Sequence, residues 1–141
     1  MPILTRSLDI DAPPNEVWRV LTNPELIREW AAAYLEGISI RTSFREGDAV
    51  TWKAPGGETR SFGKVAACKP ERLLKFDYAA DPRGAFSETF EISAIDHMTR
   101  LKVTTGPLDK ADLDALRRPS QQAIEGIKSL AEESAQIHGL R

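Results

Sequence analysis

The residue types that most often carry catalysis are few and scattered in this chain. Its 141 residues include two histidines, His97 and His138, and one cysteine, Cys68. His97 falls in a hairpin-turn signal and His138 near the end of a long helical pattern, so neither has the spacing of a metal ligand or a catalytic partner. The loop PGGE at 55–58 lacks the phosphate-binding pattern. We therefore expect no metal, no cofactor and no intrinsic catalysis.

Two charged residues stand on strand faces that are otherwise apolar. Glu88 alternates with apolar residues in FSETFEI at 86–92, and Arg6 does so in ILTRSLDI at 3–10. A buried charge is costly without a partner, so if both residues point inward we expect them to pair. The alternative is that either strand is offset by one residue, or that Arg6 extends to water at the edge of the sheet.

Composition and charge exclude several classes of partner. The chain is 41% hydrophobic and 28% charged, which is typical of a globular protein and not of a disordered one. It has 19 basic and 21 acidic residues, for a net charge of −2, and no basic run. This balance argues against binding to nucleic acid or to an anionic membrane surface. The longest apolar run, 30–35, is too short to span a bilayer.

The sequence predicts one domain in the cytoplasm. No repeat, low-complexity segment or linker divides the chain, so we expect a single domain over residues 1–141. Arg6 and Asp9 fall where a secretory signal would need an apolar core. A single cysteine cannot form an internal disulfide, which is consistent with a reducing compartment.

The elements that must position these side chains follow a clear order. A strand over 3–10 is stopped by Pro13 and Pro14, and two short helices are predicted at 15–21 and 24–32. A series of strands separated by turn residues follows, which indicates a meander of antiparallel hairpins. These strands span 37–44, 49–54, 59–69, 72–78, 86–95 and 100–105.

The last part of the chain changes to a helical period. Apolar residues recur at i, i+3, i+4 and i+7 from about Pro119 to His138, and Gly139 is a natural stop. This predicts a helix of about 20 residues, roughly 30 Å long. The helix has one apolar stripe and a curved antiparallel sheet has one apolar face, so each buries itself against the other. The fold class is therefore α+β. Gly63, in the longest strand, suggests a bulge or bend in that sheet.

The order of elements resembles the helix-grip fold of the START-like, or SRPBCC, superfamily, to which Bet v-like proteins also belong. Within it the chain resembles the branch named for the activator of the 90-kDa heat-shock protein ATPase. The resemblance implies a curved antiparallel sheet of about seven strands around a long C-terminal helix, with two short helices after the first strand. It is carried by IDAPPNEVWRVLTNPELIREW at 10–30, FGKVAACKPERLLKFDY at 62–78, ETFEISAIDHMTRLKVTTGPL at 88–108 and AIEGIKSLAEE at 123–133.

The resemblance also assigns places to particular residues. It implies that Trp30 caps the mouth of a cavity, although a plain core role is also consistent with this position. Members of the branch carry a tryptophan where this chain has Ala123, one turn before the position of Ile127. The smaller side chain either enlarges the cavity or is compensated by Trp52 or Phe62.

Alternation along the strands then predicts a cavity between the final helix and the sheet. Arg6 and Glu88 would be its main polar groups. Ala123 and Ile127 would face the cavity from the helix, where the small side chain of Ala123 leaves room. A pocket that is mostly apolar with a few polar groups favours an amphipathic ligand with a hydrogen-bonding head. The apolar lining would be Trp30, Trp52, Phe76, Tyr78, Phe86, Phe90 and Val103.

The expected function is non-catalytic binding of a small hydrophobic or amphipathic molecule in this cavity. Two alternatives follow from the resemblance. One is a small enzyme of the cyclase or hydrolase kind that some members of the superfamily are, which would need an acid–base constellation. The other is an interaction module that modulates a chaperone ATPase, which would need a partner-binding surface.

Overall fold

The computed structural model of the protein describes residues 2–79 and 84–139. Its elements follow the expected order, with two short helices after the first strand and a long helix at the end. This confirms the α+β, helix-grip fold class. In chain order the elements are β1 (Leu4–Ile10), α1 (Pro14–Thr22), α2 (Pro24–Ala31), β2 (Ser39–Thr42), β3 (Ala49–Lys53), β4 (Thr59–Lys69), β5 (Leu73–Tyr78), β6 (Phe86–Ile95), β7 (Met98–Gly106) and α3 (Lys110–Gly139).

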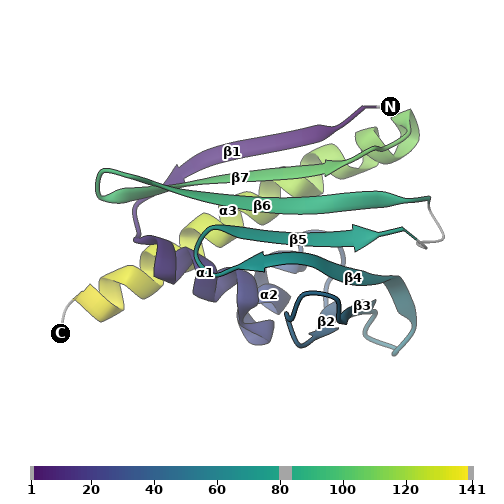
Figure 1. Ribbon diagram of the computed structural model, residues 1–141, viewed down its shortest axis with the longest axis horizontal. Coiled ribbons are helices and arrows are strands. Elements are labelled where there is room, and N and C mark those ends of the chain that lie inside the picture. Colours follow the sequence, from purple (N-terminus) through teal and green to yellow (C-terminus); the bar gives the residue numbers. More distant parts are fainter. Residues whose placement is uncertain (1, 80–83, 140–141) are drawn as a thin grey trace.

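The strands form one antiparallel sheet of seven strands in the order β1-β7-β6-β5-β4-β3-β2. From β2 to β7 the chain is a meander, and β1 pairs beside β7 at the far edge. Figure 1 shows α3 running along one face of the sheet, with α1 and α2 on the same side. The helices thus cover one face of the sheet and leave the other to solvent.

One asparagine organises the two short helices. Asn23 ends α1, and its side-chain Oδ1 accepts hydrogen bonds from the backbone N–H groups of Glu25 (2.9 Å) and Leu26 (3.3 Å) at the start of α2. Pro24 follows as the first helical residue, where its missing N–H is harmless. The local sequence therefore both stops one helix and starts the next.

β4 approaches β5 very closely at Gly63, and irregular pairing lies on both sides of it. The pairing register shifts between Trp52 and Lys53 on one neighbouring strand, and between Val65 and Ala67 within β4 itself. A Cβ atom at position 63 would lie 2.2 Å from the backbone carbonyl oxygen of β5. Only glycine permits so close an approach of the two strands.

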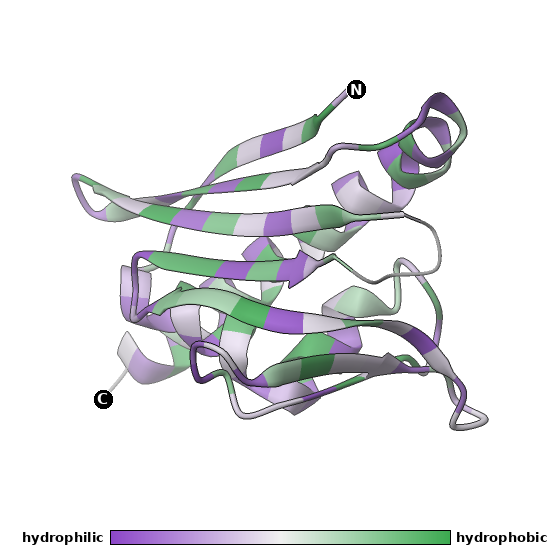
Figure 2. Cartoon of the chain, turned by 45° about the vertical axis from the view of Figure 1, so that its right-hand side comes forward, coloured by the Kyte–Doolittle hydropathy of each residue, from purple (hydrophilic) through white to green (hydrophobic). Residues whose placement is uncertain are grey.

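The core lies between the sheet and α3. Figure 2 shows hydrophobic and hydrophilic bands alternating along the strands, as expected for a sheet with one buried face. From α3 the side chains of Ile124 and Ile127 are almost completely buried against this face. No helix in the described part of the chain is both long and apolar enough to cross a membrane.

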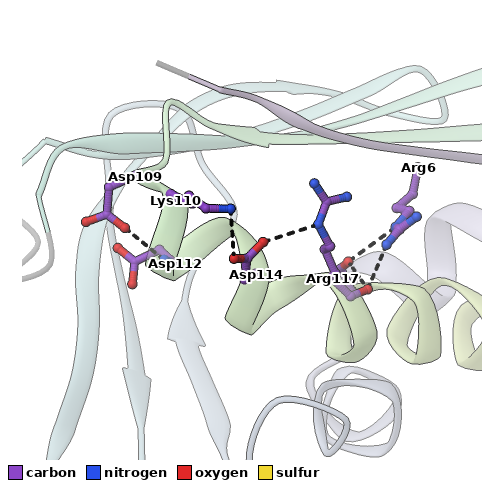
Figure 3. Close-up of polar contacts among 7 residues, drawn as sticks. Arg6, Asp109, Lys110, Asp112, Asp114 and Arg117 are labelled. Atoms are coloured by element: carbon purple, nitrogen blue, oxygen red, sulfur yellow. Dashed lines mark hydrogen bonds and ion pairs between the residues drawn. The ribbon is translucent and has the colours of Figure 1, made fainter.

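The sequence placed the start of α3 too late. The helix begins at Lys110 and continues through Pro119, which lies in its interior. The side chain of Asp109 accepts a hydrogen bond from the backbone N–H of Asp112 (2.8 Å) and so caps the start. An ion pair between Lys110 and Asp114 spans the first turns (Figure 3). These local interactions support the helix ahead of the proline, whose missing N–H removes a single helical hydrogen bond.

Candidate functional site: a cavity at one end of the sheet

A cavity of about 530 Å³ lies between the sheet and the helices, at the end of the sheet that the first turns of α3 cover. The sheet contributes side chains from most of its strands. The opposite wall comes from α2, the segment after it and α3. The lining comprises Leu4, Trp30, Ala31, Tyr34, Ile38, Trp52, Thr59, Arg60, Ser61, Tyr78, Phe86, Glu88, Thr105, Ala115, Leu116, Pro119 and Ser120.

Three aromatic side chains on the sheet wall hold one another in place. The rings of Tyr78 and Phe86 stack with their centres 4.7 Å apart, as their direct pairing across β5 and β6 requires. The indole Nε1–H of Trp52 donates a hydrogen bond to the hydroxyl of Tyr78 at 2.8 Å. Trp52 and Tyr78 are both buried, so this bond forms away from water and fixes the wall in one arrangement.

Trp30 belongs to the core and to the cavity at once. Its Nε1–H donates to the backbone carbonyl of Val20 at 3.0 Å, which locks the ring between the two short helices. Its ring meets Phe90 edge to face, with centres 6.1 Å apart. α2 can approach α3 this closely because Gly126 faces it: a Cβ there would lie 3.3 Å from the Cβ of Trp30.

The polar part of the cavity centres on Glu88. Thr105 lies directly across from it on β7, and its hydroxyl donates to the carboxylate at 3.4 Å. Tyr34, after α2, faces the same space. Burial and the negative charge of Glu88 raise the pKa of Tyr34, against a smaller opposing effect of Arg6. The phenol therefore stays protonated and can donate a hydrogen bond into the cavity.

Arg6 is not part of the cavity lining, and the predicted pairing of Arg6 with Glu88 is wrong. Its guanidinium donates to the backbone carbonyl of Arg117 at 2.7 Å and to the hydroxyl of Ser120 at 3.4 Å (Figure 3). The register explains the separation. Arg6 on β1 lies opposite Val103 on β7, whereas Glu88 on β6 lies opposite Thr105, which is two residues further along β7. The early start of α3 brings acceptors within reach of Arg6.

Several other residues expected in the lining lie in the packed core beside the cavity. Phe76 and Phe90 meet edge to face with centres 6.3 Å apart, and with Trp30 they fill the middle of the space under α3. The cavity is therefore confined to one end instead of running the length of the sheet. The expected lining residues that belong to the buried core are Phe76, Phe90, Val103, Ala123 and Ile127.

The small side chain at Ala123 adds to the packed core and not to the cavity. Ala123 is buried but does not line the open space. Phe62 does not compensate for it, since Phe62 is 41% exposed to solvent. Trp52 contributes to the cavity wall itself.

Sequence reasoning missed other lining residues for identifiable reasons. Ala115 and Leu116 were missed because the start of α3 was placed too late. Pro119 and Ser120 fall inside the predicted helix, but they were not assigned to the cavity lining. Thr105 could have been predicted. When the residues of β6 and β7 are paired outward from the hairpin turn, Thr105 comes to lie opposite Glu88. Tyr34 lies outside regular structure, where neither a helical nor a strand period marks which side chains turn inward.

The residues most suited to catalysis lie away from this cavity. His138 Nδ1 forms a hydrogen bond with the carboxylate of Glu16, between the end of α3 and α1. Burial raises the pKa of the Cys68 thiol, and Glu46 adds to the effect. His97 is exposed. Across residues 2–79 and 84–139, no three histidine, cysteine or acidic side chains gather as a metal site.

A curved antiparallel sheet around a long helix, with a cavity between them, defines the helix-grip class of START-like domains. The family described as activator of Hsp90 ATPase homolog 1-like protein matches residues 11–133, and the chain belongs to this family. No curated protein matched the sequence.

Solved structures share the fold over nearly the whole chain. The protein MLL2253 from Mesorhizobium loti is 21% identical, with a TM-score of 0.76 over 94% of this chain and 98% of its own. A protein from Cytophaga hutchinsonii is 19% identical, with a TM-score of 0.74 over 96% and 97%. The Aha1 dimer from Colwellia psychrerythraea is 15% identical, with a TM-score of 0.71 over 94% and 97%. At these low sequence identities, the similarity to the solved structures shows a shared fold only.

Proposed function

We propose that the protein binds a small hydrophobic or amphipathic molecule in the cavity, without catalysis. The observation that carries the proposal is the cavity of about 530 Å³, whose lining combines aromatic and aliphatic side chains with several polar ones. Small-molecule sites typically occupy about 300–1,000 Å³ and combine apolar walls with a few polar groups. Glu88, Thr105 and Tyr34 supply polar groups of this kind on one side of the space.

The chemistry of the lining supports binding over catalysis. General acid–base catalysis works best with a group whose pKa lies near the working pH. The pKa of Tyr34 is instead raised from its ordinary value by burial and by Glu88, so the phenol is held away from that range. Cys68 and His138 do not line the cavity.

Blocking the cavity tests this proposal. Ala115 lines the cavity from an exposed position on α3, so Ala115→Trp should fill the entrance with little loss of stability. Ala111→Trp is the matched control, because Ala111 is equally exposed on the same helix and does not line the cavity. Native mass spectrometry of freshly purified protein should show a bound small molecule in the parent and in the Ala111 variant.

The Ala115 variant should lose that molecule. Titration with 1-octanol, followed by tryptophan fluorescence, should show the same pattern, since Trp30 and Trp52 line the space. Equal binding of octanol by both variants would place the ligand elsewhere, and no binding by the parent would refute the proposal.

A second candidate function rests on the family's description, which names activators of the Hsp90 ATPase. In this alternative the protein is an interaction module that modulates a chaperone ATPase through its surface. The protein should then raise the steady-state ATPase rate of Hsp90, and Ala115→Trp should keep that effect because it alters only the cavity entrance. An unchanged ATPase rate at saturating protein would exclude this role.

A further inference from the structure

The first turns of α3, residues 110–118, cover the cavity without being packed into the core. Ala115 and Leu116 of this segment line the cavity, and none of the segment's side chains is buried. The following part of the helix differs, because several of its side chains between Ser120 and Ala131 are buried. Apolar burial therefore holds α3 in place mainly beyond Pro119.

Pro119 separates these two parts of the helix. Proline has no N–H, so the backbone carbonyl of Ala115, four residues earlier, loses its helical hydrogen bond. The ion pairs within the segment, from Asp114 to Lys110 at 3.5 Å and to Arg117 at 3.6 Å, are exposed to solvent (Figure 3). Exposed pairs of this kind contribute little to stability. The segment can therefore open locally while the buried part of the helix stays folded.

Arg6, on β1, ties the end of this segment to the sheet. Its guanidinium donates hydrogen bonds to the backbone carbonyl of Arg117 at 2.7 Å and to the hydroxyl of Ser120 at 3.4 Å (Figure 3). The hydroxyl of Ser120 in turn donates to the same carbonyl at 3.1 Å. Hydrogen bonds from a charged donor are stronger than those between neutral groups. Arg6 is therefore placed to hold the segment against the cavity.

We propose that residues 110–118 form a lid, which opens to admit and release the ligand and which Arg6 holds closed. This inference rests on the proposed binding function and specifies how access to that site is controlled. Opening a few weakly packed turns costs less than unfolding the whole chain, and binding sites commonly use such segments. Because Ala115 and Leu116 form part of the cavity wall, opening this segment widens the entrance directly.

Hydrogen exchange, measured by NMR for each amide, tests the opening without any ligand. In the parent, the amides of residues 114–118 should exchange about tenfold or more faster than those of residues 123–131. Arg6→Met keeps an apolar side chain and removes the charged donors. It should speed exchange at 114–118 a further several-fold and leave 123–131 unchanged. Equal protection of the two parts in the parent, or unchanged rates in Arg6→Met, would overturn the inference.

Arg19→Met is the matched control, because Arg19 on α1 donates to the hydroxyl of Ser134 on the same helix at 2.8 Å. It should leave residues 114–118 at the parent's exchange rates. An equal effect of both arginine substitutions would indicate a general loss of stability, and the inference would fail. If Arg6→Met does not fold, Pro119→Ala decides. Restoring the missing N–H should slow exchange at 114–118, and unchanged exchange would refute the lid.

A ligand then shows whether the lid controls access. NMR line shapes in a titration with 1-octanol give the rate at which it leaves the parent and the two arginine variants. Arg6→Met should raise this rate several-fold, whereas Arg19→Met should match the parent. If octanol binds and leaves all three proteins at the same rate, the proposed function stands but the inference fails. If octanol does not bind to the parent, the proposed function fails and the inference fails with it.

Discussion

The hydrogen bond between Trp52 and Tyr78 should be essential to the cavity wall. Tyr78→Phe removes only the hydroxyl that accepts the indole N–H at 2.8 Å. Both side chains are buried, with 9% of Trp52 and 2% of Tyr78 exposed, so the hydrogen bond is shielded from bulk water. The indole N–H is then left without a partner in an apolar setting.

The expected loss of unfolding free energy follows from this geometry. A buried donor stripped of its acceptor costs about 1–3 kcal/mol. For a chain of this length each kcal/mol lowers Tm by roughly 3–5 °C, so a loss of about 1–3 kcal/mol in Tyr78→Phe should lower Tm by roughly 3–15 °C. The fluorescence of the parent and the variant should differ as well, because the ring of Trp52 loses its anchor.

A double-mutant cycle isolates the bond from any other interaction of Tyr78. Trp52→Phe and the double variant complete the cycle, measured by urea unfolding. The double variant should be more stable, by about 1 kcal/mol or more, than the sum of the single losses predicts, because neither partner is then stranded. Tyr34→Phe serves as a control that removes a cavity hydroxyl outside the cycle. Strictly additive losses, or a Tyr78 variant that melts within a degree of the parent, would refute the reasoning.

Three further predictions concern the core, the close approach of β4 to β5 and acid stability. Ile127→Asp should lower the free energy of unfolding by several kcal/mol, because it places a charge at a position that is 1% exposed; a thermal melt measures the loss. Ile137→Asp is the control and should change the stability little, because Ile137 is exposed. Gly63→Ala should prevent or strongly weaken folding, since its Cβ would meet the Asp77 carbonyl oxygen at 2.2 Å; normal yield and circular dichroism would contradict this. Burial acts to raise the pKa of Glu16, but Ser134 and the ring of His138 outweigh it, and the net pKa is lowered. Its ionised form therefore stabilises the fold above the ordinary carboxyl pKa, and that stability is lost as the pH falls through the lower folded value. Glu16→Gln should flatten the acid side of the stability curve, and an unchanged curve would show that the contact is unimportant.

The sequence by itself determined which elements form and in what order. Asn23 and Pro24 act on the backbone within one or two residues, so the boundary between α1 and α2 could be predicted from local chemistry. The alternation of apolar residues in the strands and the helical period after Pro119 likewise depend on near neighbours. These signals fixed the fold class, since a one-sided sheet and a one-sided helix can bury their apolar faces only against each other.

Tertiary structure alone decided where the cavity lies. Its end wall depends on α3 continuing through Pro119, which brings Ser120 and the Arg117 carbonyl to a strand more than a hundred positions away in the chain. The middle of the sheet is filled because Trp30 from α2 meets Phe90. A periodic pattern indicates which face of an element turns inward. It does not specify what the opposite element places there, because that depends on how close two distant backbones come and on which side chains fill the space between them.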